Sequence, residues 1–411
     1  MFSIFSSIGP EIPFSLILLA LMGLRFEVRP KAGLWINAEP EKVFALIDIF
    51  DGKQEDWGRS ITQTYCIDQS RQIYRKVYRT TLTTGVVQSF EALFSIKNRE
   101  APSLLDIKRE GLEGRSLNNE LLTQSYRITP KDGGCHLAIA YAWGPRPLIA
   151  QILARADLWG GVHRIKGLAE TGKPREWPYQ LISASVALAT GIVSFAAFAI
   201  MLDVVWATLI ITALFIHEFG HLLAYRLMGQ PWGRMVFLPF LGAIAMPRLP
   251  FNTQGQAVFA ALMGPGFSVL LALVCAVPML LWGQAERFAI VTGLVTVYLN
   301  LFNLLPVEPL DGGVALRSVL TRLMGRHARF GLLAAGTLIV AGGLLISQII
   351  VVIFGGIAIL ANIKNRTIDA GLKPLSTLQV SISLFGYVAM LTAYLELVRF
   401  FHDQLPLLKL A

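Results

Sequence analysis

Three polar residues, His217, Glu218 and His221, interrupt an otherwise apolar segment between Asp203 and Arg226. Positions i and i+4 share one face of a helix, so the two imidazoles can bind one zinc ion, and the glutamate beside them can serve as a general base. Burying an ionisable side chain in a membrane costs several kcal/mol, so such residues usually have a function. The spacing predicts a hydrolytic zinc site inside a membrane helix.

A hydrolytic zinc site commonly has three protein ligands, so one more ligand must come from elsewhere in the chain. The best candidate is Asp311, which follows an apolar helix and a turn containing Pro306 and Pro309. Prolines end a helix, and the glycines at 312 and 313 allow the backbone to approach a buried site closely. On spacing alone, Asp311 can also be a solvated residue at an ordinary helix end.

The motifs together resemble the paired signature of the site-2 protease family of intramembrane zinc metalloproteases. They are His217–His221, the segment from Asn303 to Gly312 with its two prolines, and Gly264–Ser268 between them. These motifs lie in three successive apolar segments within residues 181 to 320. The resemblance predicts an α-helical polytopic membrane core of about 6–8 transmembrane helices.

The resemblance also implies a role for each matching residue. His217, His221 and Asp311 would bind zinc, Glu218 would be the catalytic base, and Asn303 would help to hold the substrate or the oxyanion. Two positions depart from the family pattern, with Ser268 where Asn is commoner and Glu308 where Pro is frequent. These departures concern local loop contacts more than the metal ligands.

Composition separates the chain into two parts. Of 411 residues, 54% are hydrophobic and 15% charged, and the mean hydropathy is +0.56, values typical of a polytopic membrane protein. Charged residues are dense over residues 25 to 176, whereas long spans without charge occur within 181 to 362. We therefore expect a soluble domain followed by a membrane domain.

The net charge of +9 does not indicate nucleic-acid binding, because no recognised nucleic-acid-binding motif accompanies it. Positive charge between membrane spans is typical of cytoplasmic loops. The residues concerned are Arg226, Arg234, Arg317, Arg322, Arg326, Arg329, Lys364, Arg366 and Lys373. Three cysteines offer neither a disulfide framework nor a C-x-x-C metal motif, which fits a reducing compartment.

Residues 33 to 170 predict an α+β domain. A short helix is expected over 40–50 and a long one over 147–170, where apolar residues recur at near-helical spacing. Turn clusters such as 131–134 separate the expected strands. These strands are 34–37, 72–82, 85–96, 104–108, 123–128 and 135–143.

This order of elements resembles the START-like helix-grip domains, also called SRPBCC or polyketide cyclase-like. The resemblance rests on Ile36–Phe44 with Trp57, on Thr129–Cys135, and on the final helix ending Gly167–Glu170. In that fold a long helix lies across a curved sheet and leaves an apolar cavity. The resemblance therefore implies binding of a lipid or another hydrophobic ligand. A filled core that serves only as a docking module is equally compatible with these residues.

Membrane spans are expected at 181–202, 204–226, 257–283, 288–307 and 376–398, with two short helices over 331–362 that break near Ser347 and Gln348. Residues 171–179 form a linker, with Trp177 and Tyr179 at the membrane interface. Prolines and a glycine interrupt residues 234–250, which predicts a re-entrant or interfacial hairpin. In the family, such a hairpin offers a strand edge to an unwound substrate; a plain interfacial loop is the alternative.

The expected organisation is therefore as follows. Residues 1–24 form a transmembrane or interfacial helix, 25–175 a cytoplasmic START-like domain, 176–320 the metalloprotease core, and 321–411 additional transmembrane helices. The basic loops place the START-like domain and the mouth of the active site on the cytoplasmic side of a multi-pass membrane protein.

The resulting functional hypothesis is Zn²⁺-dependent regulated intramembrane proteolysis of a transmembrane protein substrate. The START-like domain would gate or recruit that substrate, and membrane lipids surround the core. The alternative is a catalytically idle membrane receptor that binds a lipid or another hydrophobic ligand and has a purely structural zinc site. Glu218 argues against the receptor, since a structural site needs no base. A metal transporter ranks lower, because acidic and His residues do not recur along the other spans.

Overall fold

The computed structural model describes residues 26–50, 54–55, 61–110, 121–131, 133–146, 148–175, 178–240, 242–282, 287–306, 310–345 and 372–405, and a few positions between 352 and 363. It contains two compact units, divided between Ser183 and Ala184. They are called the N-terminal unit and the membrane unit below. The predictions for residues 1–24, Trp57, Trp177, Glu308, the break at Ser347 and Gln348, Lys364 and Arg366 lie outside the described residues.

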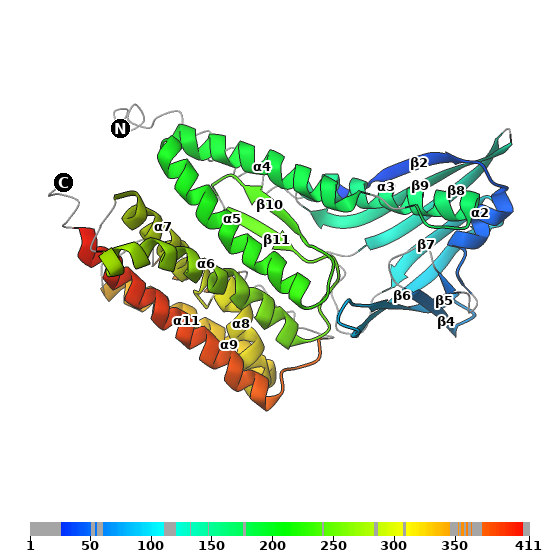
Figure 1. The fold of residues 1–411 in the computed structure, drawn as a ribbon. Helices are drawn as coiled ribbons and strands as arrows, with labels where there is room; N and C mark the ends of the chain where they lie inside the picture. The colour runs from blue at the N-terminus through cyan, green and yellow to red at the C-terminus, as the bar shows by residue number, and fades with distance from the viewer. Residues whose placement is uncertain are drawn as a thin grey trace, which may run out of the picture. The chain divides into compact units, whose positions relative to one another are not determined.

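In the described residues, the N-terminal unit is an antiparallel sheet with two helices (Figure 1). Its strands pair in the order β1-β9-β8-β7-β6-β5-β4-β3, and β2 also pairs with β9. The strands are β1 (Phe26–Val28), β2 (Lys31–Ile36), β3 (Gln54–Glu55), β4 (Ile61–Asp68), β5 (Ile73–Thr81), β6 (Val87–Glu100), β7 (Leu104–Glu110), β8 (Leu121–Lys131) and β9 (Gly134–Arg146). The helices are α2 (Pro40–Ile47) and α3 (Leu148–Thr171).

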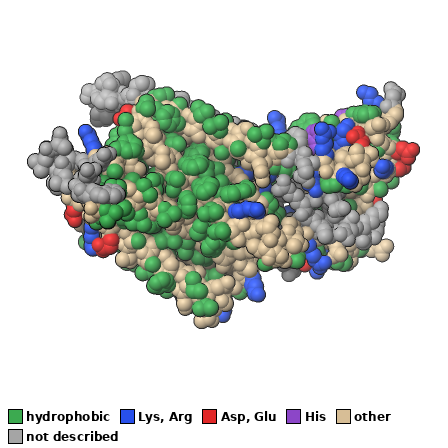
Figure 2. All heavy atoms as spheres, viewed as in Figure 1, with side chains coloured by type: hydrophobic (Ala, Val, Ile, Leu, Met, Phe, Trp, Pro, Cys, Tyr) green, Lys and Arg blue, Asp and Glu red, His purple; other side chains and the backbone are tan. Residues whose placement is uncertain are grey.

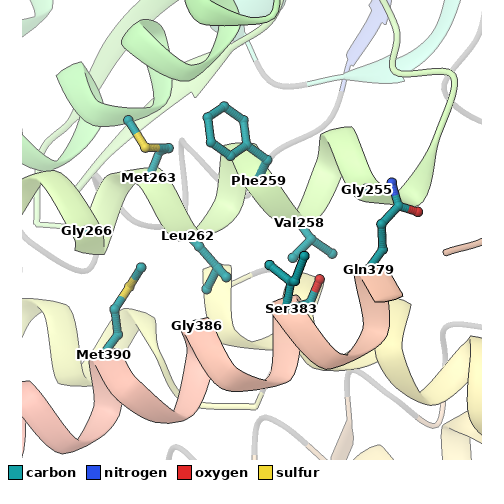
Figure 3. A pocket seen from close by; sticks show the side chains of 11 residues that line it. Gly255, Val258, Phe259, Leu262, Met263, Gly266, Gln379, Ser383, Gly386 and Met390 are labelled. Carbon is teal, nitrogen blue, oxygen red and sulfur yellow. The ribbon is translucent and has the colours of Figure 1, made fainter. Parts of the chain in front are cut away.

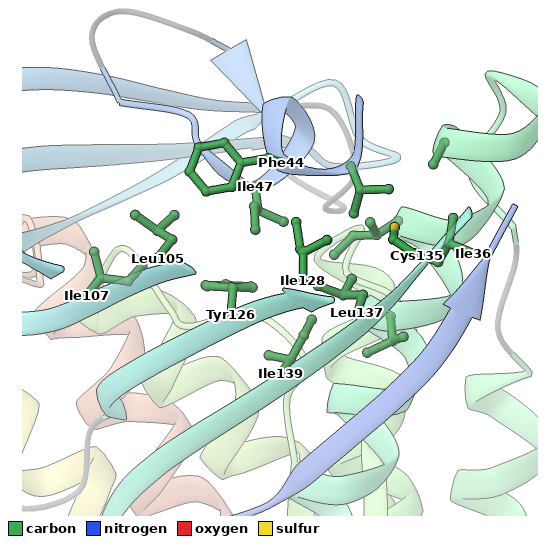
Figure 4. Packing of buried hydrophobic residues seen from close by; sticks show 14 of the residues in the cluster. Ile36, Phe44, Ile47, Leu105, Ile107, Tyr126, Ile128, Cys135, Leu137 and Ile139 are labelled. Atoms are coloured by element: carbon green, nitrogen blue, oxygen red, sulfur yellow. The ribbon is translucent and has the colours of Figure 1, made fainter. Parts of the chain in front are cut away.

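The core of this unit follows from two periodicities. Alternate residues of β9, Cys135, Leu137 and Ile139, are buried because side chains of a strand point to opposite faces in turn. Val162 and Ile165 of α3 are buried at helical spacing. Figure 4 shows side chains from α2 and from the strands directed into one cluster. The predicted α+β helix-grip fold is confirmed.

Some element bounds differ from the prediction. Strand β4 was not expected; it pairs along β5, with Thr62 opposite Tyr78. Its apolar residues do not alternate regularly with polar ones, so hydrophobic alternation does not reveal it. The helix expected over 40–50 ends at Ile47, although Phe50 beyond it is fully buried.

Cys66, Cys135 and Cys275 are all free thiols. Burial, with a smaller contribution from the charge of Glu41, raises the pKa of the Cys135 thiol. A thiol that stays protonated is a poor nucleophile. Cys135 therefore serves as a core residue.

The membrane unit consists of apolar helices and one β-hairpin (Figure 1). Its helices are α4 (Tyr179–Met201), which begins at the end of the N-terminal unit, α5 (Val204–Leu227), α6 (Gln254–Trp282), α7 (Arg287–Asn303), α8 (Asp311–Met324), the short η2 (Gly325–His327), α9 (Ala328–Leu345) and α11 (Thr377–Gln404). The hairpin is formed by β10 (Arg234–Leu238) and β11 (Gly242–Met246), which confirms the hairpin predicted within 234–250.

Among the described residues, five helices are long and apolar enough to cross a membrane: α4, α5, α6, α9 and α11. Helix α7 is apolar but shorter, with 17 residues. Large hydrophobic side chains such as Leu338, Leu345 and Phe385 are more than two-thirds exposed, and Figure 2 shows hydrophobic side chains spread over the visible face of these helices. The chain is thus an integral membrane protein.

The structure corrects the prediction around Asp311. The span expected to reach residue 307 ends at Asn303, and the segment after Asp311 is helix α8 rather than a loop. Arg317 and Arg322, expected in that loop, are helical. The close approach of α8 to the end of α7 requires Gly312, because a Cβ there would lie 2.1 Å from the Leu304 carbonyl oxygen.

Candidate active site

Helix α5 presents the HExxH residues on its buried side. Only 3% of His217, 5% of Glu218 and 7% of His221 is exposed. The helix is continuous from Val204 to Leu227, and the Asp203 side chain caps its first turn by accepting a hydrogen bond from the Trp206 backbone N–H at 2.9 Å. The unbroken helix places both imidazoles on one face, one turn apart.

Asp311 reaches this face from the first turn of α8. Its Oδ2 atom lies 3.1 Å from His217 Nε2 and 3.4 Å from His221 Nε2. The two Nε2 atoms are 3.2 Å apart. The structure thus brings together the three residues that the sequence analysis named as metal ligands.

The other ring nitrogen of each histidine, Nδ1, forms a hydrogen bond with an oxygen. His217 Nδ1 lies 2.8 Å from Asn300 Oδ1, and the Asn300 amide is oriented by donating its Nδ2 proton to the Thr296 carbonyl oxygen at 2.7 Å. His221 Nδ1 lies 2.7 Å from the Ala260 carbonyl oxygen. Both oxygens can only accept, so each Nδ1 carries the proton, and the Nε2 of the neutral imidazole presents a lone pair.

Three electron-pair donors therefore converge on one point. No hydrogen-bond donor from the described residues satisfies Asp311 Oδ2, although this atom is buried. Ligands about 2.1 Å from zinc at tetrahedral angles lie about 3.4 Å from one another, close to the observed separations of 3.1 to 3.4 Å. These residues fit a zinc ion, which would offset their mutual repulsion.

Helix α6 approaches the two histidines closely because Gly264 has no side chain. A Cβ at Gly264 would lie 2.4 Å from His221 Nε2, and one at Gly220 of α5 would lie 2.3 Å from the Met263 carbonyl oxygen. Small residues of this kind allow membrane helices to pack with their backbones in near contact. The glycine of the Gly264–Ser268 motif thus makes room for the imidazoles.

Glu218 lies beside the ligands and against strand β11. The group formed by His217, Glu218 and His221 has its ligand atoms within 4.8 Å of one another. The Glu218 carboxylate accepts a hydrogen bond from the Ala245 backbone N–H, and the Tyr225 hydroxyl donates to the Ala245 carbonyl oxygen at 3.2 Å. Strand β11 is therefore held directly beside the general-base candidate.

All of these residues border one cleft of about 640 Å³ within the membrane unit. Its walls come mainly from α5, α6, α7, α8 and β11, and most of the residues that line it are apolar. Asn303 also lines the cleft, but its Nδ2 donates to the Leu299 carbonyl oxygen at 3.2 Å. The predicted role of Asn303 toward the substrate stays a prediction.

Neither Asn300 nor Tyr225 belongs to a motif that the sequence reveals. Asn300 is fully buried, and a polar amide within an apolar helix one turn before Asn303 was the available signal. Tyr225 lies one turn after His221, where an aromatic residue at a membrane boundary is ordinary. Only the fold shows that each contacts the site.

Replacing Asn300 with alanine should lower zinc affinity about 10- to 100-fold, the usual cost of losing a partner that orients a metal-binding histidine. The His217 Nδ1–H would lose its acceptor. Zinc affinity would be measured by competition with a chelating dye. Asn300→Asp should retain most of the affinity. Asn303→Ala is the matched control, because the Asn303 amide donates to the Leu299 carbonyl oxygen and not to a metal-binding histidine. Equal affinities for Asn300→Ala and Asn303→Ala would contradict this role.

Comparison with known proteins places these motifs in context. No protein-family model matches the chain. A curated relative from Synechocystis sp., named as a zinc metalloprotease, is 31% identical over 140 residues, which cover 33% of this chain and 36% of the relative. The match thus spans about a third of that relative's length. It confirms the resemblance to zinc metalloproteases that the motifs predict.

Two of the solved structures that match represent the two parts of the chain. The site-2 protease from Methanocaldococcus jannaschii covers 47% of this chain and 93% of its own length, at 19% identity and a TM-score of 0.32. The Aha1 dimer from Colwellia psychrerythraea covers 36% of this chain and 98% of its own, at 10% identity and a TM-score of 0.23.

Proposed function

We propose that this protein is an intramembrane zinc metalloprotease that cleaves transmembrane segments of other proteins in regulated intramembrane proteolysis. The observation that carries the proposal is the convergence of His217 Nε2, His221 Nε2 and Asp311 Oδ2 within 3.1 to 3.4 Å. Glu218 is buried beside them in a cleft of a membrane-embedded unit. A structural site requires no base in that position, whereas hydrolysis does.

The chemistry divides between the metal and the chain. When bound, zinc would act as a Lewis acid that polarises the scissile carbonyl. Glu218 takes a proton from the attacking water and passes it to the leaving amide nitrogen, so the C–N bond breaks and the water oxygen remains in the new carboxyl group. Asn303, on the cleft wall, would donate its amide to the developing oxyanion after releasing the Leu299 carbonyl.

Strand β11 supports a model for substrate binding. On β10, the Phe237 N–H points away from β11, because it donates to Thr190 Oγ1 at 3.2 Å. Phe237 lies opposite Ala243, so the antiparallel alternation directs the backbone groups of Ala243 and Ala245 away from β10. The Ala245 groups are already bonded to Glu218 and Tyr225. A substrate unwound into an extended chain would therefore pair with the Ala243 part of this edge, which gives affinity without selecting side chains.

The site lies within the membrane rather than at its surface. His217 precedes Arg226, the next arginine or lysine along the chain, by nine residues, so it lies about 13 Å along the helix from Arg226. If this end is cytoplasmic, cleavage occurs in the cytoplasmic half of the substrate helix. The START-like domain, residues 25–175 of the N-terminal unit, would gate the active site or recruit the substrate under control of a bound hydrophobic ligand.

The test uses full-length protein reconstituted in liposomes with single-span model substrates. We expect cleavage that 1,10-phenanthroline abolishes and stoichiometric Zn²⁺ restores, with cut sites, located by mass spectrometry, in the half of the substrate nearer the Arg226 end. Cleavage that survives complete removal of zinc would refute the metalloprotease assignment.

The same assay tests the START-like unit. A chain lacking residues 1–175 should still bind zinc, which reports an intact centre, but cleave with altered rate or selectivity. Equal rates on the native substrate, with and without lipid extract, would rule out the regulatory role.

A further inference from the structure

A second hollow lies between α6 and α11, outside the catalytic cleft. This α6–α11 groove has a volume of about 300 Å³. Its walls are Gly255, Val258, Phe259, Leu262, Met263 and Gly266 of α6, and Gln379, Ile382, Ser383, Gly386 and Met390 of α11. The cleft instead borders α6 at Ala257, Ala260 and Ala261. The groove and the metal site therefore occupy different faces of the same turns of α6.

The groove is apolar along most of its length and polar at one end. Figure 3 shows Leu262 and Met390 toward one end, and Val258, Ser383 and Gln379 toward the other. The Gln379 amide packs against Gly255, where a Cβ would lie 3.0 Å from Gln379 Nε2. A ligand that fits must have an apolar body and a polar end.

A basic residue lies at the polar end. The segment before α11 pairs with the segment before α6, since the Lys373 N–H donates to the Asn252 carbonyl oxygen at 2.8 Å and the Gln254 N–H to the Lys373 carbonyl oxygen at 2.9 Å. This pairing places Lys373 next to Gly255, and Lys373 is exposed. The positive ends of both helix dipoles point to the same region. The polar end therefore favours a negative charge.

The length of the groove matches one leaflet of a bilayer. Gly255 to Gly266, and Gln379 to Met390, each advance eleven residues, or about 16 Å along a helix. One leaflet contributes half of a hydrocarbon core of about 30 Å. A chain that enters at the membrane surface would thus run to the end of the groove at the bilayer midplane.

The volume indicates a narrow occupant. One turn of a helix about 10 Å wide occupies roughly 400 Å³, more than the whole groove, so a transmembrane helix cannot enter it. An extended acyl chain is narrow enough. Gly386 forms part of the wall, and the nearest atom to a Cβ placed there would be Leu262 Cδ1 at 3.7 Å, so the absent side chain leaves room for such a chain.

We propose that the α6–α11 groove binds an anionic phospholipid, with one acyl chain between the helices and the phosphate near Lys373. The bound phospholipid belongs to the bilayer leaflet whose surface is on the same side as Lys373. Anionic lipids attract basic residues at a membrane surface, and one cation contributes about a fivefold preference. This site is independent of the proposed proteolysis, because none of its lining residues is a metal ligand or a candidate catalytic residue.

The test is native mass spectrometry of the purified full-length protein after equilibration with equimolar phosphatidylglycerol and phosphatidylcholine. We expect one retained phosphatidylglycerol, in about fivefold excess over phosphatidylcholine. Lys373→Glu should remove the preference, whereas Lys173→Glu, the same charge change at an exposed residue of the N-terminal unit, should retain it.

A second pair of variants tests the acyl chain. Gly386→Leu fills the groove and should lower retention of both lipids severalfold, while Ala389→Leu, at an exposed position of α11 that does not line the groove, should not. Equal retention of the two lipids by the unaltered protein would overturn the proposal. An unchanged lipid preference in the Lys373→Glu protein would also overturn it, because the Lys373 side chain is exposed and its replacement should not disturb the fold. Unchanged lipid retention in a folded Gly386→Leu protein would do the same.

Discussion

Glutamine in place of Glu218 should reduce proteolysis by about 10²- to 10⁴-fold, the usual contribution of a general acid–base residue, and leave zinc binding intact. Glutamine has the same shape, and its Oε1 can still accept the hydrogen bond from the Ala245 N–H. It cannot take up a proton at neutral pH. Loss of cleavage with zinc retained would assign Glu218 to proton transfer and not to metal binding.

Turnover is measured as the initial cleavage rate in liposomes, and zinc binding is measured separately as zinc content by mass spectrometry. Glu396→Gln is the matched control, because Glu396 is an exposed residue of α11 paired with Arg399 at 2.8 Å; its rate should be unchanged. A Glu218→Gln protein with full activity would refute the mechanism. Zinc-loaded unaltered protein that cleaves no membrane substrate would instead favour the idle receptor.

Alanine in place of Asp311 should lower zinc occupancy severalfold and abolish cleavage. The substitution removes the carboxylate that lies within 3.4 Å of both Nε2 atoms and leaves two neutral ligands. Losing a residue that only orients a ligand already costs 10- to 100-fold in affinity, so losing a ligand should cost more. The measurement is zinc per chain after dialysis against buffered free zinc.

Asp203→Ala is the control for loss of an aspartate at a helix start. Asp203 caps α5 but does not approach the metal ligands, so this variant should lose about 1 kcal/mol of stability and keep its zinc. Asp311→Asn separates charge from shape and should bind zinc more weakly than the unaltered protein. Full zinc retention by Asp311→Ala would remove this residue from the centre.

The two halves of the candidate site differed in how well the sequence predicted them. His217, Glu218 and His221 are within five residues of one helix, and helix geometry alone puts them on one face. Asp311 is ninety residues after His221, and spacing alone left it open as a solvated helix end. Family resemblance selected it. In the fold, α8 packs against α6 and Gly312 approaches the Leu304 carbonyl just after α7, which brings the Asp311 carboxylate to the histidines.

Strand β4 and helix α8 were not predicted from the sequence, and the reason is the same for both. The apolar residues of strand β4 do not alternate regularly, so the strand is recognised by its pairing with β5. Helix α8 carries Arg317 and Arg322, so its sequence resembles a charged loop between spans. In both segments the neighbours determine the conformation, and local hydrophobic periodicity carries little information.

The sequence by itself determined the chemistry: a membrane helix with two imidazoles and a base at helical spacing, apolar spans, and an α+β domain before them. These features depend on near neighbours in the chain, whose geometry is set by the period of a helix or strand. Only the tertiary structure decided what surrounds the metal ligands. Asn300, Ala260 and Gly264 reach the histidines from other helices, because close packing of membrane helices selects partners by shape, and shape is a property of the assembled fold.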